Sequence, residues 1–121
     1  MTLKGSCLCK ATQFEVARPP ADVADCNCSS CSKRGALWAY YDEVEFKLTT
    51  APERVSTYQW GDYMMKLHYC GICGCATYNE GPVWKDGEID FSVNRIGVNA
   101  RLFDDFDLAA VPVRHVNGKD A

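Results

Sequence analysis

Hydrophobic and polar residues alternate along several short stretches of the chain, and turn-forming residues separate these stretches. Alternation with a period of two is typical of strands that bury one face, and the stretches are rich in β-branched and aromatic residues. Groups that contain glycine, proline, asparagine or aspartate divide them. The pattern predicts strands within 11–17, 37–49, 54–60, 63–69 and 88–98, with turns at 18–22, 49–53, 60–62, 79–82 and 85–88.

Two further segments have the marks of short helices. In the segment 29–35, Ser29 or Ser30 can cap the first turn and Gly35 can end the last one in the left-handed conformation. The segment 100–110 could form a second short helix before Pro112. Neither is long enough to connect parallel strands, so we expect a mostly β fold made of small antiparallel sheets.

Length and charge limit the number of domains and the kind of partner. The chain has 121 residues, which is enough for one hydrophobic core and too few for two ordinary domains. We therefore expect a single domain over residues 1–121. The 13 basic and 16 acidic side chains leave a formal net charge of -3. Because this balance provides no broad cationic field for a phosphate backbone, we do not expect nucleic acid as a partner.

The start of the chain, MTLKGSCLCK, lacks the apolar core of a secretory signal. No apolar run approaches the roughly 20 residues that a membrane span requires, so we expect a cytoplasmic protein without a membrane partner. A reducing cytosol keeps thiols reduced. The eight cysteines are therefore more consistent with metal binding than with a disulfide framework.

The spacing of the cysteines predicts how they would bind a metal. Side chains two positions apart on an extended chain point to one side, so a CxC pair can offer two sulfurs to one ion, and CxxC wraps a turn around an ion. A tetrahedral zinc site usually combines two such half-sites from remote parts of a chain. We predict a structural zinc with four thiolate ligands, Cys7, Cys9, Cys70 and Cys73. The alternative is that these cysteines are only small buried hydrophobic residues.

Cys26, Cys28 and Cys31 form a separate CxCxxC cluster, here called the triplet. Three thiolates can hold a zinc ion and leave its fourth position open, which distinguishes a catalytic zinc from a structural one. Cys75 provides an alternative, because eight thiols would fill two closed sites if its sulfur completed the triplet. We favour the open, catalytic site, since Cys75 follows directly on the turn where Cys73 is already committed to the first ion.

The cysteine motifs, in the order GSCLC, CNCSSCSKRGAL and YCGICG, resemble those of the glutathione-dependent formaldehyde-activating enzyme family, also called the centromere protein V/GFA domain. The match runs from Gly5 to about Tyr78, and by overall length it extends over the whole chain. The resemblance implies a β-tent fold, a structural zinc on the four cysteines and a catalytic zinc on the triplet. It also implies the namesake activity, the condensation of formaldehyde with glutathione to S-hydroxymethylglutathione, which is carbon-sulfur lyase chemistry in reverse.

Two residues depart from the pattern of this family. Asn27 stands between the first two cysteines of the triplet, where many members carry histidine. An amide does not exchange protons near neutral pH, so no imidazole role can be transferred to this position. Cys75 stands where a small hydroxyl or apolar residue is expected, and it is a spare thiol, a buried hydrophobic residue or a ligand of the second site.

Together these features predict a zinc-dependent enzyme of the carbon-sulfur lyase type, with two zinc ions per chain and a small thiol such as glutathione as substrate. Zinc held by three thiolates is a weaker Lewis acid than zinc held by histidines, which suits thiol binding better than ionisation of water. The alternative is a noncatalytic zinc-ribbon-like binding module with two structural zincs. Nothing in the sequence indicates an oligomeric state.

Three residues near the cysteines are candidates for supporting roles. Lys33 and Arg34 follow the triplet and would meet a carboxylate of the substrate, unless they are solvated loop cations. His68 precedes Cys70 by two residues. Its ring would orient a sulfur ligand through a hydrogen bond, or it is a strand residue whose ring is satisfied elsewhere.

Overall fold

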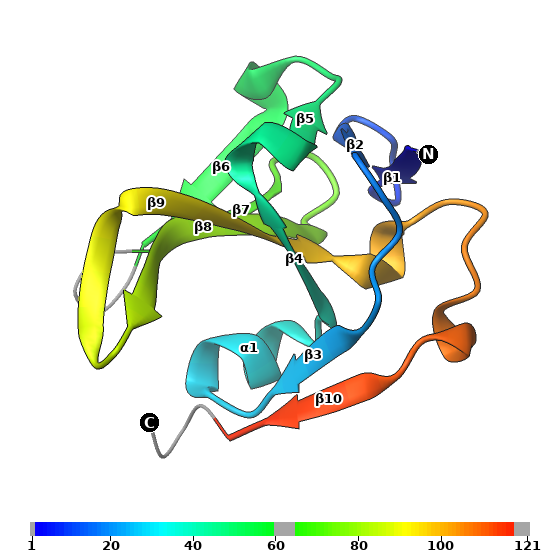
Figure 1. The fold of residues 1–121 in the computed structure, drawn as a ribbon. Coiled ribbons are helices and arrows are strands. Elements are labelled where there is room, and N and C mark those ends of the chain that lie inside the picture. The colour runs from blue at the N-terminus through cyan, green and yellow to red at the C-terminus, as the bar shows by residue number, and fades with distance from the viewer. Residues whose placement is uncertain (1, 60–64, 118–121) are drawn as a thin grey trace.

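The computed structural model describes residues 2–59 and 65–117 (Figure 1). These residues are mostly β, as predicted. Within the described ranges, no helix has the length and hydrophobicity that a membrane span requires. The elements are β1 (Leu3–Ser6), β2 (Gln13–Val16), β3 (Val23–Cys26), α1 (Ser29–Arg34), β4 (Trp38–Asp42), β5 (Phe46–Leu48), β6 (Val55–Tyr58), β7 (Lys66–Cys70), β8 (Ala76–Lys85), β9 (Glu88–Asn99) and β10 (Val113–Val116), with 3-10 turns at Glu43–Glu45, Pro52–Arg54, Ala100–Leu102 and Leu108–Ala110.

The strands form two sheets. β1, β2 and β5 make a three-stranded antiparallel sheet, and the other strands make a larger sheet in the order β10-β3-β4-β9-β8-β7-β6. The larger sheet is antiparallel except at one edge, where β10 runs parallel to β3. In Figure 1 the small sheet lies at the top, α1, β3 and β10 lie at the bottom, and the β8–β9 hairpin reaches to the left. The expected small antiparallel sheets are thus confirmed, with one parallel pair in addition.

The main core connects the two sheets through aromatic side chains. Phe14 of β2 and Phe46 of β5 have ring centroids 5.8 Å apart, and Phe46 meets Tyr78 of β8 at 4.6 Å. Offset aromatic pairs of this kind add to the stabilisation from burial alone. Gly5 of β1 lies against Phe14, because a Cβ at this glycine would come within 2.6 Å of the Phe14 ring atom Cε1. A separate small cluster, Ala24, Ala36 and Trp38, is buried where α1 joins the larger sheet.

The structure corrects two local predictions. No turn forms at 79–82, because β8 continues through this segment and pairs with β9 on both sides of it. The register shifts between Gly81, which pairs with Arg95, and Val83, which pairs with Asp90, so the extra residues of this irregularity lie on β9. Pro82 has no N–H to donate to the ladder at this point. The segment 100–110 forms two separate 3-10 turns and no α-helix. Side chains of Asn99 and Asp107 cap these turns by accepting bonds from the backbone N–H two residues ahead.

Other predictions agree with the structure or lie outside the described residues. Strands form within each predicted stretch, although a 3-10 turn divides 37–49 into β4 and β5. The helix at 29–35 is confirmed and ends at Gly35, whose φ of 63° is left-handed. The turn predicted at 60–62, and the first two residues of the stretch 63–69, fall outside the described residues.

Candidate metal centres

The first cluster brings together two cysteine pairs that are remote in the sequence. Cys7 and Cys9 follow β1, Cys70 ends β7, and Cys73 lies on the turn after β7. Their four Sγ atoms all lie within 4.8 Å of one another. The Cys9 Sγ lies 3.7 Å from the Cys7 Sγ and 3.7 Å from the Cys70 Sγ. We call this set the four-cysteine cluster.

These distances fit a zinc ion and exclude disulfides. The sulfurs of a disulfide are about 2 Å apart. Zinc–sulfur bonds of about 2.3 Å in a tetrahedron place neighbouring sulfurs about 3.8 Å apart. All eight cysteines lie within the described residues, and all are free thiols. The spacing and the donor type together fit a zinc ion.

Backbone N–H groups point at the sulfurs of the four-cysteine cluster. The N–H of Thr12 donates to the Cys7 Sγ at 3.3 Å, and the N–H of Ile72 donates to the Cys70 Sγ at 3.4 Å. Burial raises the pKa of Cys70, but bonds from the N–H groups of Cys73 and Ile72 outweigh it and lower the pKa overall. Hydrogen bonds to a thiolate favour the form that binds metal. The backbone is therefore arranged for thiolate ligands.

The CxC pair reaches this geometry by a route different from the one predicted. It does not lie on an extended strand. The N–H of Lys10 donates to the Cys7 carbonyl at 3.1 Å, and Lys10 has a φ of 66°, so the pair lies on a tight turn. Like the CxxC turn, this turn therefore curves around the space enclosed by the four sulfurs, where an ion would bind.

The triplet lies where β3 passes into α1. Cys26 ends β3, Cys28 is the N-cap of α1, and Cys31 lies in the first turn of the helix. The three Sγ atoms lie within 4.8 Å of one another. The N–H of Cys31 donates to the Cys28 Sγ at 3.4 Å, so the thiol of Cys28 acts as the cap that Ser29 or Ser30 was predicted to supply. The side chain of Cys28 therefore belongs to the triplet and also caps the helix.

Electrostatics at the triplet favour a bound cation. Burial raises the pKa of Cys31, and hydrogen bonding and negative charge at Cys28, with the charge of Cys26, raise it further. Burial also raises the pKa of Cys28, but hydrogen bonds from the N–H and the thiol of Cys31 outweigh burial and lower the pKa overall. Thus one thiolate forms readily while three together repel one another. A divalent cation removes this repulsion, which fits the thiolate donor set for zinc.

Cys75 lies with the four-cysteine cluster and away from the triplet. Its side chain packs with Cys73 against buried Cys7, Ala11 and Cys70, and its carbonyl accepts a bond from the Cys70 N–H at 2.9 Å. Cys75 is in neither group of mutually close sulfurs. The alternative in which it completes a second closed site does not match this position.

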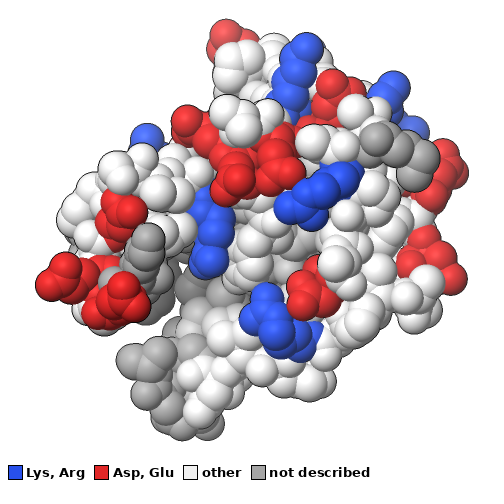
Figure 2. All heavy atoms as spheres, viewed as in Figure 1, with Lys and Arg blue, Asp and Glu red and all other residues white. Residues whose placement is uncertain are grey.

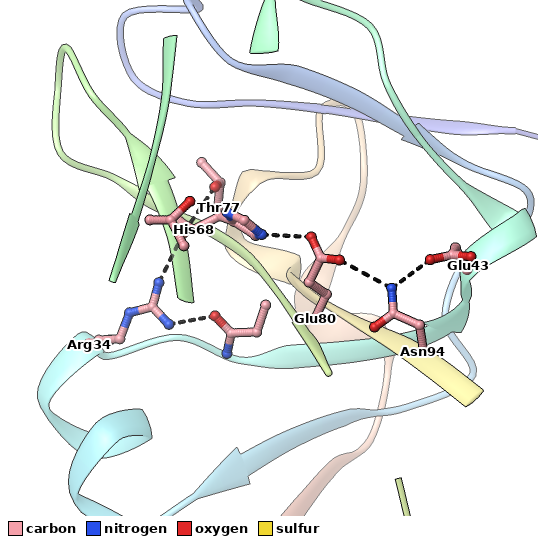
Figure 3. A network of polar contacts seen from close by, with 8 residues as sticks. Arg34, Glu43, His68, Thr77, Glu80 and Asn94 are labelled. Atoms are coloured by element: carbon pink, nitrogen blue, oxygen red, sulfur yellow. Dashed lines mark hydrogen bonds and ion pairs between the residues drawn. The ribbon is translucent and has the colours of Figure 1, made fainter. Parts of the chain in front are cut away.

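Arg34 connects the helix that carries the triplet to the larger sheet (Figure 3). Its Nη1 donates to Asn79 Oδ1 at 2.6 Å, and its Nη2 donates to the His68 carbonyl at 3.0 Å. The guanidinium also lies 5.4 Å from the ring centroid of Trp38. Burial lowers the pKa of Arg34. In this structure the fork of Arg34 is therefore occupied by acceptors of the protein, and its predicted contact with a substrate carboxylate stays a prediction.

Lys33 lies on the side of α1 away from Cys28. It lines an open cavity of about 380 Å³, whose lining residues are Ser29, Ser30, Lys33, Arg34, Tyr58 and Leu67. Residues 28, 31 and 32 share one side of a helix, whereas residues 29, 30 and 33 turn to the other. The structure thus separates Lys33 from the sulfur of Cys28, and its substrate contact also stays a prediction.

The ring of His68 is satisfied away from the sulfurs, as one of the two interpretations of this residue expected. Its Nε2 donates to Glu80 Oε2 at 2.7 Å, and its Nδ1 lies 2.8 Å from the Thr57 hydroxyl. Asn94 donates to the other oxygen of Glu80 and to Glu43, which extends the network along β9 (Figure 3). His68 contacts α1 through its backbone carbonyl, which accepts a hydrogen bond from Arg34.

Sequence reasoning missed the acceptors that hold Arg34. Asn79 is separated from Arg34 by 45 positions, and no local pattern connects the two residues. It also missed a stacked pair on the larger sheet, in which the guanidinium of Arg95 lies 4.2 Å from the ring centroid of Tyr40. Both contacts depend on the order of strands in the sheet, which cysteine spacing does not reveal.

Two comparisons with known proteins match nearly the whole chain. A family model described as glutathione-dependent formaldehyde-activating enzyme matches residues 2–116. A crystal structure of a Rhodobacter sphaeroides protein has a TM-score of 0.71 to this chain at 28% sequence identity. That similarity covers 91% of this chain and 98% of the other. The range matched by the family model includes every cysteine of the chain.

Proposed function

Because the chain belongs to the glutathione-dependent formaldehyde-activating enzyme family, we propose that it is a zinc-dependent enzyme of the carbon-sulfur lyase type. The substrate is a thiol adduct, such as the S-hydroxymethylglutathione that formaldehyde and glutathione form. We propose two zinc ions per chain, a structural one at the four-cysteine cluster and a catalytic one at the triplet. The uneven division of thiols is the observation that carries this proposal, since four sulfurs meet at one place and three at the other.

The position of Cys75 supports an open site at the triplet. Its packing with Cys73 leaves the triplet with three protein sulfurs. Zinc supplies positive charge that favours the thiolate form of an incoming thiol over the thiol itself. A thiolate is the nucleophilic form of sulfur.

The chain contributes the position of the ligands. The N-cap bond holds the Cys28 sulfur against the N–H of Cys31, and the bonds of Arg34 to Asn79 and His68 fix α1 on the larger sheet. A group held in place in advance lowers the entropic cost of bringing two reactants together. The contacts of α1 therefore orient the ligands of the triplet, and their main role is not proton transfer.

The bonds that change can be stated for the family reaction. In the condensation, the sulfur of the thiol forms a bond to the carbonyl carbon of formaldehyde. The π electron pair of the carbonyl moves to oxygen, and oxygen gains the proton that the thiol gives up. In the lyase direction the carbon–sulfur bond breaks, and the hydroxyl proton returns to sulfur.

We further propose that residues 1–121 form one zinc-binding domain in the cytoplasm. The four-cysteine cluster joins the loop after β1 to the loop after β7, so one ion would tie remote parts of the chain together. A reducing compartment would keep the eight cysteines as thiols, the state in which they bind metal.

Zinc content tests the assignment of the ligands. We expect two equivalents of zinc in the wild-type protein and one in Cys28→Ala. The neighbouring Ser32→Ala variant serves as the control, because its side chain is no part of either cluster, and we expect it to keep two. Two equivalents in Cys28→Ala would overturn the triplet as a zinc site.

Carbon-13 exchange spectroscopy tests the activity. It measures exchange between free formaldehyde and its glutathione adduct at equilibrium. We expect the wild-type protein to raise the exchange rate above the uncatalysed background, and Cys28→Ala to leave it at background. Equal rates with and without a protein that holds two zincs would favour the noncatalytic binding module.

A further inference from the structure

Arg95 is an exposed cation on β9, in the larger sheet that also carries the triplet. Among residues 2–59 and 65–117, no carboxylate lies within ion-pair distance of its guanidinium. The residue opposite Arg95 in the sheet is Asp42. The carboxylate of Asp42 instead caps the 3-10 turn that follows β4, in a reciprocal arrangement with Glu45. The charge of Arg95 is therefore not neutralised by a partner on the described surface.

The backbone of the sheet builds the place where Arg95 lies. Tyr40 of β4 and Gly97 of β9 are opposite one another. A Cβ at residue 97 would lie 3.2 Å from the Tyr40 ring atom Cε1, so the absence of a side chain lets the ring lie against the strand. Arg95 is two positions before Gly97 and projects from the same face. Its guanidinium lies 4.2 Å from the ring centroid of Tyr40, close enough for a strong cation–π contact.

Tyr40 links Arg95 to the triplet. Tyr40 and Cys31 both pack against the buried cluster of Ala24, Ala36 and Trp38. Burial raises the pKa of the Tyr40 hydroxyl, Arg95 counteracts this, and negative charge at Cys31 raises it again. The ring of Tyr40 thus contacts the guanidinium of Arg95 and packs against the same buried cluster as Cys31.

Other cations near this position already have partners. Arg34 is occupied by Asn79 and the His68 carbonyl. Arg114, whose charge also acts on Tyr40, makes an ion pair with Asp22 at 3.4 Å. In Figure 2, acidic side chains gather at the outer end of the β8–β9 hairpin and in a second group near the upper centre, and a basic side chain lies directly below this second group. An arginine stacked on an aromatic ring keeps its planar N–H fork free for a carboxylate.

We propose that Arg95, stacked on Tyr40, binds the anionic group of the thiol substrate, so that the triplet selects thiols that carry a carboxylate. This inference rests on the proposed function, in which the thiol binds at the triplet. Arg95 acts as a specificity residue: the sulfur reaches the triplet while the carboxylate meets the guanidinium. A neutral thiol would bind at the same place without this contact.

Two thiols of similar length test the proposal, 3-mercaptopropionate with a carboxylate and 2-mercaptoethanol without one. Each is titrated into protein loaded with Co²⁺ in place of Zn²⁺, and the sulfur-to-cobalt charge-transfer band gives the dissociation constant. We expect wild-type protein to bind 3-mercaptopropionate about 5- to 10-fold more tightly, from one partly exposed charge-assisted contact. This preference should shrink as salt is added, because the contact is open to solvent.

Three variants separate the role of Arg95 from general effects of charge. In Arg95→Gln we expect the preference to disappear, with binding of 2-mercaptoethanol unchanged. Tyr40→Phe keeps the stacking ring and should keep the preference. Lys47→Gln removes a positive charge from an exposed position on β5, in the smaller sheet, and is the matched control, so it should also keep the preference.

The outcomes distinguish a failure of this inference from a failure of the proposed function on which it rests. If both thiols change the band but Arg95→Gln retains the wild-type preference, the role of Arg95 is overturned and the thiol site stands. A preference lost equally in Lys47→Gln would also overturn it, because the effect would then be one of overall charge. If neither thiol changes the band, the proposed thiol site fails, and the inference fails with it.

Discussion

Replacement of Arg34 by lysine should loosen the helix that carries the triplet. Arg34 makes two hydrogen bonds, to Asn79 at 2.6 Å and to the His68 carbonyl at 3.0 Å, and stacks on Trp38. Lysine keeps the charge and can keep one of these bonds, but it loses the planar fork. The lost bond is worth about 1.5 kcal/mol, the lower limit for a charged donor, because the side chain is only half-buried. The weaker stacking adds roughly 0.5 kcal/mol.

We therefore expect the free energy of unfolding of zinc-loaded Arg34→Lys to fall by about 2 kcal/mol. Urea unfolding followed by tryptophan fluorescence measures this loss of stability. The urea concentration at the midpoint should fall by about 1 M, if the free energy of unfolding decreases by about 2 kcal/mol per molar urea. We also expect a chelator to remove zinc from the triplet faster, since α1 carries two of its three ligands.

Lys33→Ala is the matched control for this prediction, because it removes the neighbouring cation, for which the described residues show no hydrogen bond or ion pair. Its free energy of unfolding should change by less than about 0.5 kcal/mol. If Arg34→Lys unfolds and releases zinc like the wild-type protein, the contacts of Arg34 do not hold α1 in place, and the reasoning is wrong.

Three further changes test other parts of the structure. Gly5→Ala should lower the free energy of unfolding by about 1–3 kcal/mol, because its Cβ would overlap the buried ring of Phe14; a thermal melt equal to that of the wild-type protein would contradict this. The bond from His68 lowers the pKa of Glu80, so this carboxylate stabilises the fold above its ordinary pKa of 4.5 and the stabilisation is lost as the pH falls through the lowered value. Glu80→Gln should thus be less stable than the wild-type protein at pH 7 and lose less stability in acid, which urea midpoints across pH 3–7 would show; parallel pH curves would count against it. Cys75→Ala should keep two equivalents of zinc by elemental analysis, and a loss of one would make Cys75 a ligand.

The cysteine geometry could be predicted from the sequence because it depends mostly on spacing. Both clusters that spacing indicated bring their sulfurs together. Gly35 ends α1 as expected, since a left-handed residue after a helix is a local requirement. The position of Cys75 beside Cys73 also follows from short-range constraints, because one residue cannot move its sulfur to a distant cluster.

Features that depend on pairing between remote strands could not be predicted. The residues at 79–82 are typical of a turn, but their pairing with β9 keeps them in strand β8, with an irregular register at Pro82. Serine was the expected cap of α1, but the nearby Cys28 sulfur accepts the N–H bond. The bond between Arg34 and Asn79 could not be predicted either, because these residues become neighbours only through the order of strands in the sheet.

The central claim is that four cysteine sulfurs bind one zinc and three bind the other. The number of sulfurs around each zinc tests this claim most directly. X-ray absorption at the zinc edge, on protein with two equivalents of zinc, counts these ligands. We expect seven sulfurs over the two ions and one lighter atom, and eight sulfurs after a thiol substrate is added. Eight sulfurs before any thiol is added, or a count that the thiol leaves unchanged, would contradict an open site at the triplet.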